Sequence, residues 1–197
     1  TQSAARERAQ LIGSIDYRVE LDLTGGDEHL GFDARVDFTS VRPGARTFIE
    51  AGVDRVEEIV WNGRRLPNSA YDGHRIALPE LEENNSIRVR GAASYDHTGL
   101  GLHRSTDPVD GSSYIYSDFE PYEAHRTFPC FDQPDLKGSF RFRVRVPGDW
   151  SVVSAEPGSP EDPDPSDGTR WWDFPATMPL APYVIGLAAG PFHMVKS

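Results

Sequence analysis

The fold is decided by residues 15–38, which read IDYRVELDLTGGDEHLGFDARVDF. Apolar residues occupy every second position from Ile15 to Leu23, and the alternation resumes from Leu30 to Phe38. A period of two is typical of a β-strand that buries one face and exposes the other. Gly25-Gly26-Asp27 lies between the two runs and supplies turn residues. This stretch therefore predicts an antiparallel hairpin of two half-buried strands.

Shorter strands are predicted along the rest of the chain, each bounded by Gly, Pro or Asn. The strands and strand-like apolar stretches expected from the pattern are 47–49, 56–61, 75–78, 86–90, 140–146, 171–172 and 183–192. Asn62-Gly63 predicts a type I′ turn with both residues at positive φ. Residues 156–168, rich in Pro, Asp and Ser, predict an exposed loop, and Ala4 to Ile12 predict a short helix.

The expected fold class is all-β, a mostly antiparallel β-sandwich with a short N-terminal helix. Nothing in the pattern alternates strands with helices, so no parallel strand–helix–strand unit is expected. With 38% hydrophobic residues the chain can close a substantial core. We take residues 1–197 as one domain.

Charge and cysteine content limit the classes of binding partner and the cellular compartment that we expect. The formal net charge of −11 argues against a nucleic-acid partner, because phosphate binding needs concentrated Lys and Arg. Cys130 is the single cysteine, so no internal disulfide can form, and we predict a cytoplasmic location. No apolar stretch approaches the length of a bilayer span, and the first residues, TQSAARERAQ, are unlike a signal peptide. No membrane partner is expected.

Catalytic motifs are missing from the sequence. There is no H-E-x-x-H, and the six histidines are too dispersed to place two ligands on one helical turn. There is also no G-x-S-x-G elbow, phosphate-binding loop or dinucleotide fingerprint. We therefore expect neither a metal site nor a catalytic residue in this chain.

One aromatic-rich segment, Tyr114 to Phe140, departs from the β-pattern and is expected to be ordered, irregular and partly buried. Its carboxylates Asp118 and Glu120 lie two residues apart on an extended run, so they should point to the same side. Two like charges held together need a nearby cation, hydrogen bonds or solvent. A bound ammonium group would serve as that cation. The alternative is a salt-bridged edge strand with no binding role.

The same segment carries a resemblance to a known family. Residues 119–137, FEPYEAHRTFPCFDQPDLK, resemble the signature of zinc aminopeptidases of the aminopeptidase N type, especially bacterial and actinobacterial members. The resemblance is supported by TGLGLHRSTDPVDG at 98–111, VPGDWSVVSAEP at 146–157 and PLAPYVIGLAAGPF at 179–192. It therefore extends over nearly the whole chain.

That resemblance implies a saddle-shaped N-terminal β-domain packed on a downstream catalytic domain, which would supply H-E-x-x-H and bind zinc. The parent enzyme would remove single residues from the amino ends of peptides. The fragment alone would contain no zinc and would be inactive. Its partners would be peptide substrates and its own catalytic domain.

The resemblance also implies a role for two residues. Glu120 matches the family glutamate that accepts hydrogen bonds from the free α-ammonium of the substrate. The family commonly has Gln at the position of Asp118. We therefore hypothesise that Asp118 adds negative charge beside the first side-chain pocket and favours Arg or Lys there.

Other signature residues are interpreted as structural. Arg126, Asp132 and Lys137 are expected to form ion pairs, and Cys130 is expected to be a buried small apolar residue. The residues expected to fill the core are Phe128, Phe131 and Leu136. The residues expected either in the core or at a domain interface are the tryptophans Trp61, Trp150, Trp171 and Trp172.

Two other functions stay open from the sequence. The chain could be a freestanding β-sandwich that binds carbohydrate or peptide on Trp171 and Trp172. A hydrolase of different chemistry on the same fold, such as a relative with epoxide hydrolase activity, is also compatible with the motifs. The aminopeptidase interpretation additionally predicts an exposed apolar patch where a catalytic domain docks.

Overall fold

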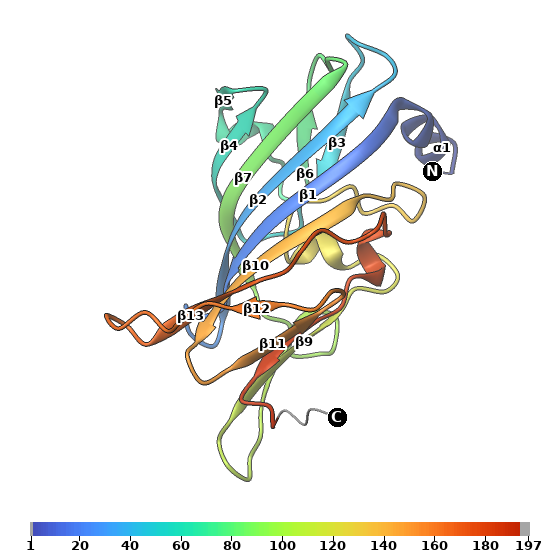
Figure 1. The fold of residues 1–197 in the computed structure, drawn as a ribbon. Helices are drawn as coiled ribbons and strands as arrows, with labels where there is room; N and C mark the ends of the chain where they lie inside the picture. The colour runs from blue at the N-terminus through green and yellow to red at the C-terminus, as the bar shows by residue number, and fades with distance from the viewer. Residues whose placement is uncertain (1, 194–197) are drawn as a thin grey trace.

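A computed structural model describes residues 2–193, which form three β-sheets with one α-helix and short 3-10 helices (Figure 1). The helical elements are α1 (Gln2–Leu11), η1 (Asn68–Ala70), η2 (Ala124–Arg126) and η3 (Pro182–Val184). The predicted all-β class and the short N-terminal helix are confirmed. None of the helices in this part of the chain is long and apolar enough to cross a membrane.

The largest sheet has eight strands. In spatial order they are β12 (Ser159–Pro160), β13 (Thr169–Asp173), β10 (Ser139–Pro147), β1 (Ile12–Asp22), β2 (His29–Ser40), β7 (Asn84–Ser94), β4 (Arg55–Trp61) and β5 (Arg64–Leu66). The predicted hairpin is confirmed, because β1 and β2 pair antiparallel with Tyr17 opposite Val36. β1 also pairs in parallel with β10, where Tyr17 lies opposite Phe140. A parallel neighbour requires a long connection, and here most of the domain separates the two strands.

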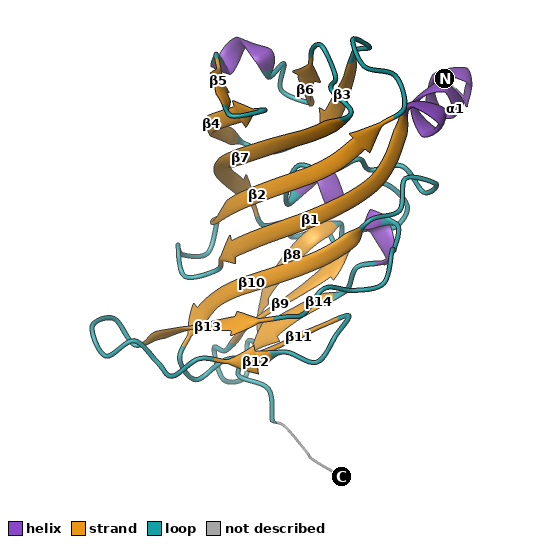
Figure 2. Ribbon diagram, turned by 45° about the horizontal axis from the view of Figure 1, so that its top comes forward, coloured by secondary structure: helices purple, strands orange, loops and turns teal. Residues whose placement is uncertain are grey.

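Two smaller sheets complete the fold. The four-stranded sheet runs in the order β11 (Ser151–Ser154), β14 (Leu187–Gly190), β9 (Ser113–Asp118) and β8 (Gly101–Thr106), and the two-stranded sheet pairs β3 (Thr47–Glu50) with β6 (Arg75–Leu78). In Figure 2 the four-stranded sheet lies behind β10 and β13, and the β3–β6 pair lies near the opposite end of the large sheet.

The core is built from the alternate residues of the large sheet. On β1 and β10 the buried set includes Tyr17 and Phe140, whose rings stack with centroids 4.2 Å apart. The opposite, outer face of this sheet is charged and ion-paired across strands. Arg88 Nε donates to Asp33 Oδ1 at 2.8 Å, and Arg90 lies 3.2 Å from Glu58. One face therefore supplies apolar burial, and the other is covered by solvated ion pairs.

The irregular segment after β9 is packed inside the domain. The backbone N–H of Phe131 donates to Tyr17 Oη at 3.1 Å, which ties this segment to β1. Cys130 pairs with Glu50 as an isolated bridge, which ties it to β3. The segment joins the large sheet to the two-stranded sheet, so its aromatic residues become core.

Several predicted boundaries are corrected. Tyr114 to Asp118 belong to a regular strand, β9, because they pair with β8 and β14, so the irregular segment begins only at Phe119. The final predicted strand is shorter than 183–192, because η3 precedes it and Pro182 has no N–H to offer a sheet. The turn is confirmed, with φ of 45° at Asn62 and 77° at Gly63. The exposed loop at 156–168 is confirmed apart from the two-residue β12.

Candidate functional site

Asp118 is the last residue of β9, an interior strand of the four-stranded sheet. Ile115 of this strand is fully buried, whereas Tyr116 and Asp118 lie on the opposite, outer face. Gly101 of β8 is the cross-strand partner of Asp118. The Asp118 carboxylate is therefore displayed at the end of a rigid strand, next to a residue without a side chain.

Glu120 is exposed and begins the turn that follows β9. The paired strand ends at Asp118, but burial still alternates along the next two residues, because the buried Phe119 lies between the exposed Asp118 and Glu120. Among residues 2–193 no basic side chain lies within ion-pair distance of either carboxylate. The alternative of a salt-bridged edge strand is wrong, since β9 lies between β14 and β8.

The turn that carries Glu120 is held at both ends. Phe119 is buried, and its carbonyl accepts the N–H of Glu123 at 3.0 Å. At the other end, the backbone N–H and Nδ1 of His125 both donate to Asp132 Oδ2, at 3.1 and 2.8 Å. Two donors on one buried carboxylate fix the conformation of η2. The turn is therefore a rigid support for an exposed Glu120 side chain.

Gly52 supports the same turn from the end of β3. Its N–H donates to the carbonyl of His125 at 2.8 Å, and the ring of Tyr122 packs at a tilt of 41° against His125, with centroids 4.4 Å apart. The predicted ion pair of Arg126 is confirmed, at 2.8 Å from Glu123 and 3.5 Å from Asp96. The sequence did not predict this role of His125, because the histidine and its carboxylate are seven residues apart with no motif to join them.

Of the other two residues expected in ion pairs, one has a partner and one has none. Asp132 is buried and lies 2.8 Å from His125 Nδ1, which makes an ion pair when His125 is protonated. Lys137 is exposed and has no carboxylate within ion-pair distance in the described chain. An exposed lysine gains little from such a pair, which is why the pattern of charges alone misplaced it.

The outer face of the four-stranded sheet is partly apolar. Val153, Ala188, Tyr116 and His103 form one cross-strand row on β11, β14, β9 and β8. Val153 is 49% exposed and Tyr116 is 43% exposed. Asp118 shares this face with Tyr116, so the Asp118 carboxylate lies beside an uncovered apolar surface.

The residues of this site lie in a region that matches a known protein family. The peptidase M1 N-terminal domain matches residues 69–184, a range that includes Asp118, Glu120 and the whole supporting turn. The chain belongs to the M1 peptidase family.

Relatives of this M1 N-terminal domain are much longer proteins. The chain is 39% identical to aminopeptidase N of Streptomyces lividans over 201 residues, covering 100% of this chain and 23% of that protein. It is 32% identical to probable aminopeptidase 1 of Saccharolobus solfataricus, covering 61% of this chain and 15% of that protein. The chain thus spans about a quarter or less of the length of these relatives.

A solved structure shows the same fold. An M1 zinc metallopeptidase mutant from Deinococcus radiodurans superposes with a TM-score of 0.71 at 22% identity, over 91% of this chain and 42% of that chain. At this level of identity the likeness concerns the fold alone.

Signature residues expected in the core of the M1 N-terminal domain are there. Phe128, Phe131 and Leu136 are buried, and Phe128 packs edge-on against Phe119 and Phe142. Cys130 is buried as well, and burial raises the pKa of its thiol well above the ordinary value. A thiol that stays protonated is a poor nucleophile, which agrees with a packing role.

The tryptophan pair does not form one platform. Trp171 lies opposite Arg145 on β10 and stacks under the guanidinium of Arg143, at 4.5 Å from the ring centroid. Trp172 points to the other face of β13, where it stacks on Phe174. Adjacent residues on a strand face opposite sides, so both rings cannot contact one sugar. Trp61 and Trp150 are buried, as expected.

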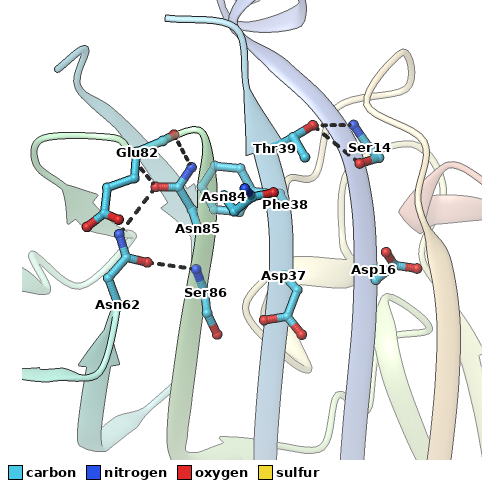
Figure 3. A pocket seen from close by; sticks show the side chains of 10 residues that line it. All are labelled: Ser14, Asp16, Asp37, Phe38, Thr39, Asn62, Glu82, Asn84, Asn85 and Ser86. Carbon is cyan, nitrogen blue, oxygen red and sulfur yellow. Dashed lines mark hydrogen bonds between the residues drawn. The ribbon is translucent and has the colours of Figure 1, made fainter. Parts of the chain in front are cut away.

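A polar hollow of about 550 Å³ lies over β1, β2, β7 and the β4–β5 turn (Figure 3). Two of its amides are engaged in local structure. Asn85 Oδ1 accepts the N–H of Glu82 at 2.8 Å, and Asn62 Oδ1 accepts the N–H of Ser86 at 2.8 Å. These contacts shape the turn.

The metal-ligating side chains of residues 2–193 are dispersed. No three His, Cys, Asp or Glu side chains there are grouped closely enough to hold an ion.

Proposed function

We propose that this chain is the N-terminal domain of a zinc-dependent aminopeptidase that removes single residues from the amino ends of peptides. The family match and the names of the relatives support this assignment. Zinc, the activated water and the hydrolytic step are assigned to a downstream catalytic domain. The fragment by itself is inactive in this proposal, and its location is predicted to be cytoplasmic.

The observation that carries the proposal is that the Glu120 side chain is exposed and unpaired within residues 2–193. It is an exposed carboxylate without a cationic partner among the described side chains, on a turn held by Phe119 and by the His125–Asp132 pair. A carboxylate on a backbone held in this way is available to accept charge-assisted hydrogen bonds from an α-ammonium group. An amine that is acylated or part of a peptide bond carries no such charge. Glu120 would therefore make the parent an exopeptidase.

The catalytic domain is assigned to the outer face of the four-stranded sheet. This face carries the exposed Val153 and Tyr116 next to Asp118, whereas the outer face of the large sheet is covered by ion pairs. Burying an apolar face is favourable, and burying a charged face costs desolvation. Docking on the four-stranded sheet would also bring Asp118 and Glu120 toward a shared active site.

The test of the anchor is Glu120→Gln in the full-length enzyme. Glutamine keeps the shape of the side chain but loses its charge, so kcat/KM for unblocked peptides should fall about 10- to 100-fold, as expected for one hydrogen bond to a charged group. Glu83→Gln is the matched control, because Glu83 is exposed and has no ion pair within residues 2–193. Equal kcat/KM values for Glu120→Gln and wild type would reject the anchor.

The specificity hypothesis for Asp118 is tested separately. An acid beside the first side-chain pocket should favour Arg or Lys there by Coulomb attraction. In the full-length enzyme, Asp118→Asn should lower the ratio of kcat/KM for Arg over Leu substrates. An unchanged ratio would discard this role and leave that of Glu120 untouched.

A further inference from the structure

A second hollow, of about 500 Å³, lies between α1, the β2–β3 loop and the two-stranded sheet. Its volume is within the range of small-molecule sites. The charged residues that line it are Glu7, Arg8, Arg42, Arg46, Glu50 and Arg75. Four arginines against two glutamates give this hollow a positive balance of charge in a chain of net charge −11.

Three of these arginines have no acidic partner. Most arginines of the described chain form ion pairs, such as Arg88 with Asp33. By contrast, no carboxylate among residues 2–193 lies within ion-pair distance of Arg42, Arg46 or Arg75. Unpaired guanidinium groups that face one hollow make it attractive to an anion.

Stacking holds two of the guanidinium groups in place. The ring of Phe48 lies 4.5 Å from the guanidinium carbon of Arg8 and 4.1 Å from that of Arg75. An arginine stacked in this way loses less side-chain entropy when it binds an oxyanion.

A buried carboxyl group completes the wall. The Glu50 side chain is only 3% exposed, and its Oε1 accepts a hydrogen bond from Arg8 Nη1 at 2.7 Å. Its second oxygen, Oε2, is buried and accepts no hydrogen bond of good geometry from the described residues, although the backbone N–H groups of Glu50 and Asp132 lie near the carboxyl group and oppose the rise in its pKa. An unpaired buried oxygen is costly, and a ligand N–H or O–H group would satisfy it.

We propose that this hollow binds a small organic anion that carries carboxylate or phosphate groups and an adjacent hydroxyl or amine. The oxyanion groups pair with Arg42, Arg46 and Arg75, for which the guanidinium fork is well matched. The hydroxyl or amine donates to Glu50. This site does not depend on the proposed peptidase function.

The test is calorimetric titration of the full-length protein with citrate, tricarballylate and inorganic phosphate. Citrate should bind at one site and about tenfold more tightly than tricarballylate, which has the same three carboxylates but no hydroxyl to donate to Glu50. Equal affinities would overturn the role of Glu50. Comparison of citrate with phosphate identifies which oxyanion the arginines prefer.

Two variants locate the site. Arg46 is exposed and has no ion pair in the described chain, so Arg46→Gln should weaken citrate binding about tenfold without affecting folding. Arg75→Gln should weaken citrate binding by the same factor, provided that its thermal midpoint matches that of wild type. Arg64→Gln is the control, because Arg64 is exposed and outside the hollow. The proposal would be overturned if citrate did not bind at millimolar concentration. It would also be overturned if Arg46→Gln and Arg64→Gln weakened citrate binding equally.

Discussion

Gly52 is a residue whose missing side chain shapes the candidate site. A Cβ at this position would lie 2.8 Å from Cδ2 and 3.1 Å from Nε2 of His125. The ring cannot move away freely, because Nδ1 is held by the buried Asp132. The close approach of β3 to the turn that carries Glu120 therefore requires glycine.

Gly52→Ala should accordingly destabilise the domain. The expected loss in the free energy of unfolding is about 1 to 3 kcal/mol, the usual cost of overpacking. Urea denaturation of the chain would measure it. Gly186→Ala is the control, because nothing lies within 4 Å of its ideal Cβ. Equal stabilities of the two variants would show that the His125 ring yields to a methyl group.

At the scale of elements, α1 is fastened to the sheets by buried polar groups. Arg8 donates from Nη1 to Glu50 at 2.7 Å and from Nε to Gln133 at 3.1 Å. Gln133 in turn donates to the carbonyl of Ala5 at 2.9 Å. A single short helix with few apolar residues thereby gains specific contacts to β3 and to the irregular segment.

Arg8→Met should lower the free energy of unfolding by about 3 to 5 kcal/mol, because it leaves Glu50 buried without its cation. Burial raises the pKa of Glu50 above its ordinary value of 4.5, and Arg8 opposes that rise. A carboxyl group with a raised folded pKa stabilises the fold below pH 4.5, and this contribution is lost as pH rises through the folded pKa.

Removal of Arg8 raises the pKa of Glu50 further. Arg8→Met should therefore lower the free energy of unfolding less at pH 5 than at pH 8. Urea unfolding at the two pH values is the measurement. In the double variant Arg8→Met/Glu50→Gln, the loss in the free energy of unfolding relative to wild type should no longer depend on whether it is measured at pH 5 or pH 8. A loss from Arg8→Met that is the same at both pH values would contradict this assignment of charge.

At the scale of the whole molecule, the two outer sheet faces differ in chemistry. The large sheet presents ion pairs such as Arg143 with Asp173 at 3.2 Å, and the four-stranded sheet presents Val153 and Tyr116. This difference distinguishes the face assigned to the catalytic domain from the one assigned to solvent.

Val153→Asp should therefore act only in the full-length protein. In the 197-residue chain the substitution is at the surface and should change the thermal midpoint little. In the full-length protein it would bury an unpaired carboxylate at the domain interface and lower the midpoint by several degrees. Val60→Asp, on the outer face of the large sheet, is the matched control. Equal shifts for the two variants in the full-length protein would reject the docking face.

The elements that could be predicted are those with a local signal. The hairpin of β1 and β2 follows from alternation, and the β4–β5 turn follows from Asn62-Gly63. β8 and β11 were not predicted from alternation, because GLHRST has no clear period and SVVS is too short. These two strands form because β9 and β14 offer them hydrogen-bonding edges.

The sequence by itself determined the all-β class, the main hairpin and the family, because periodicity, turn residues and a long motif are local properties of the chain. The tertiary structure decided the parallel pairing of β1 with β10, the partner of Asp132 and the buried pair of Arg8 and Glu50. It also decided that the large sheet exposes ion pairs and that the four-stranded sheet exposes Val153 and Tyr116. These features depend on residues brought together from distant parts of the chain, and such contacts leave no period or spacing in the sequence.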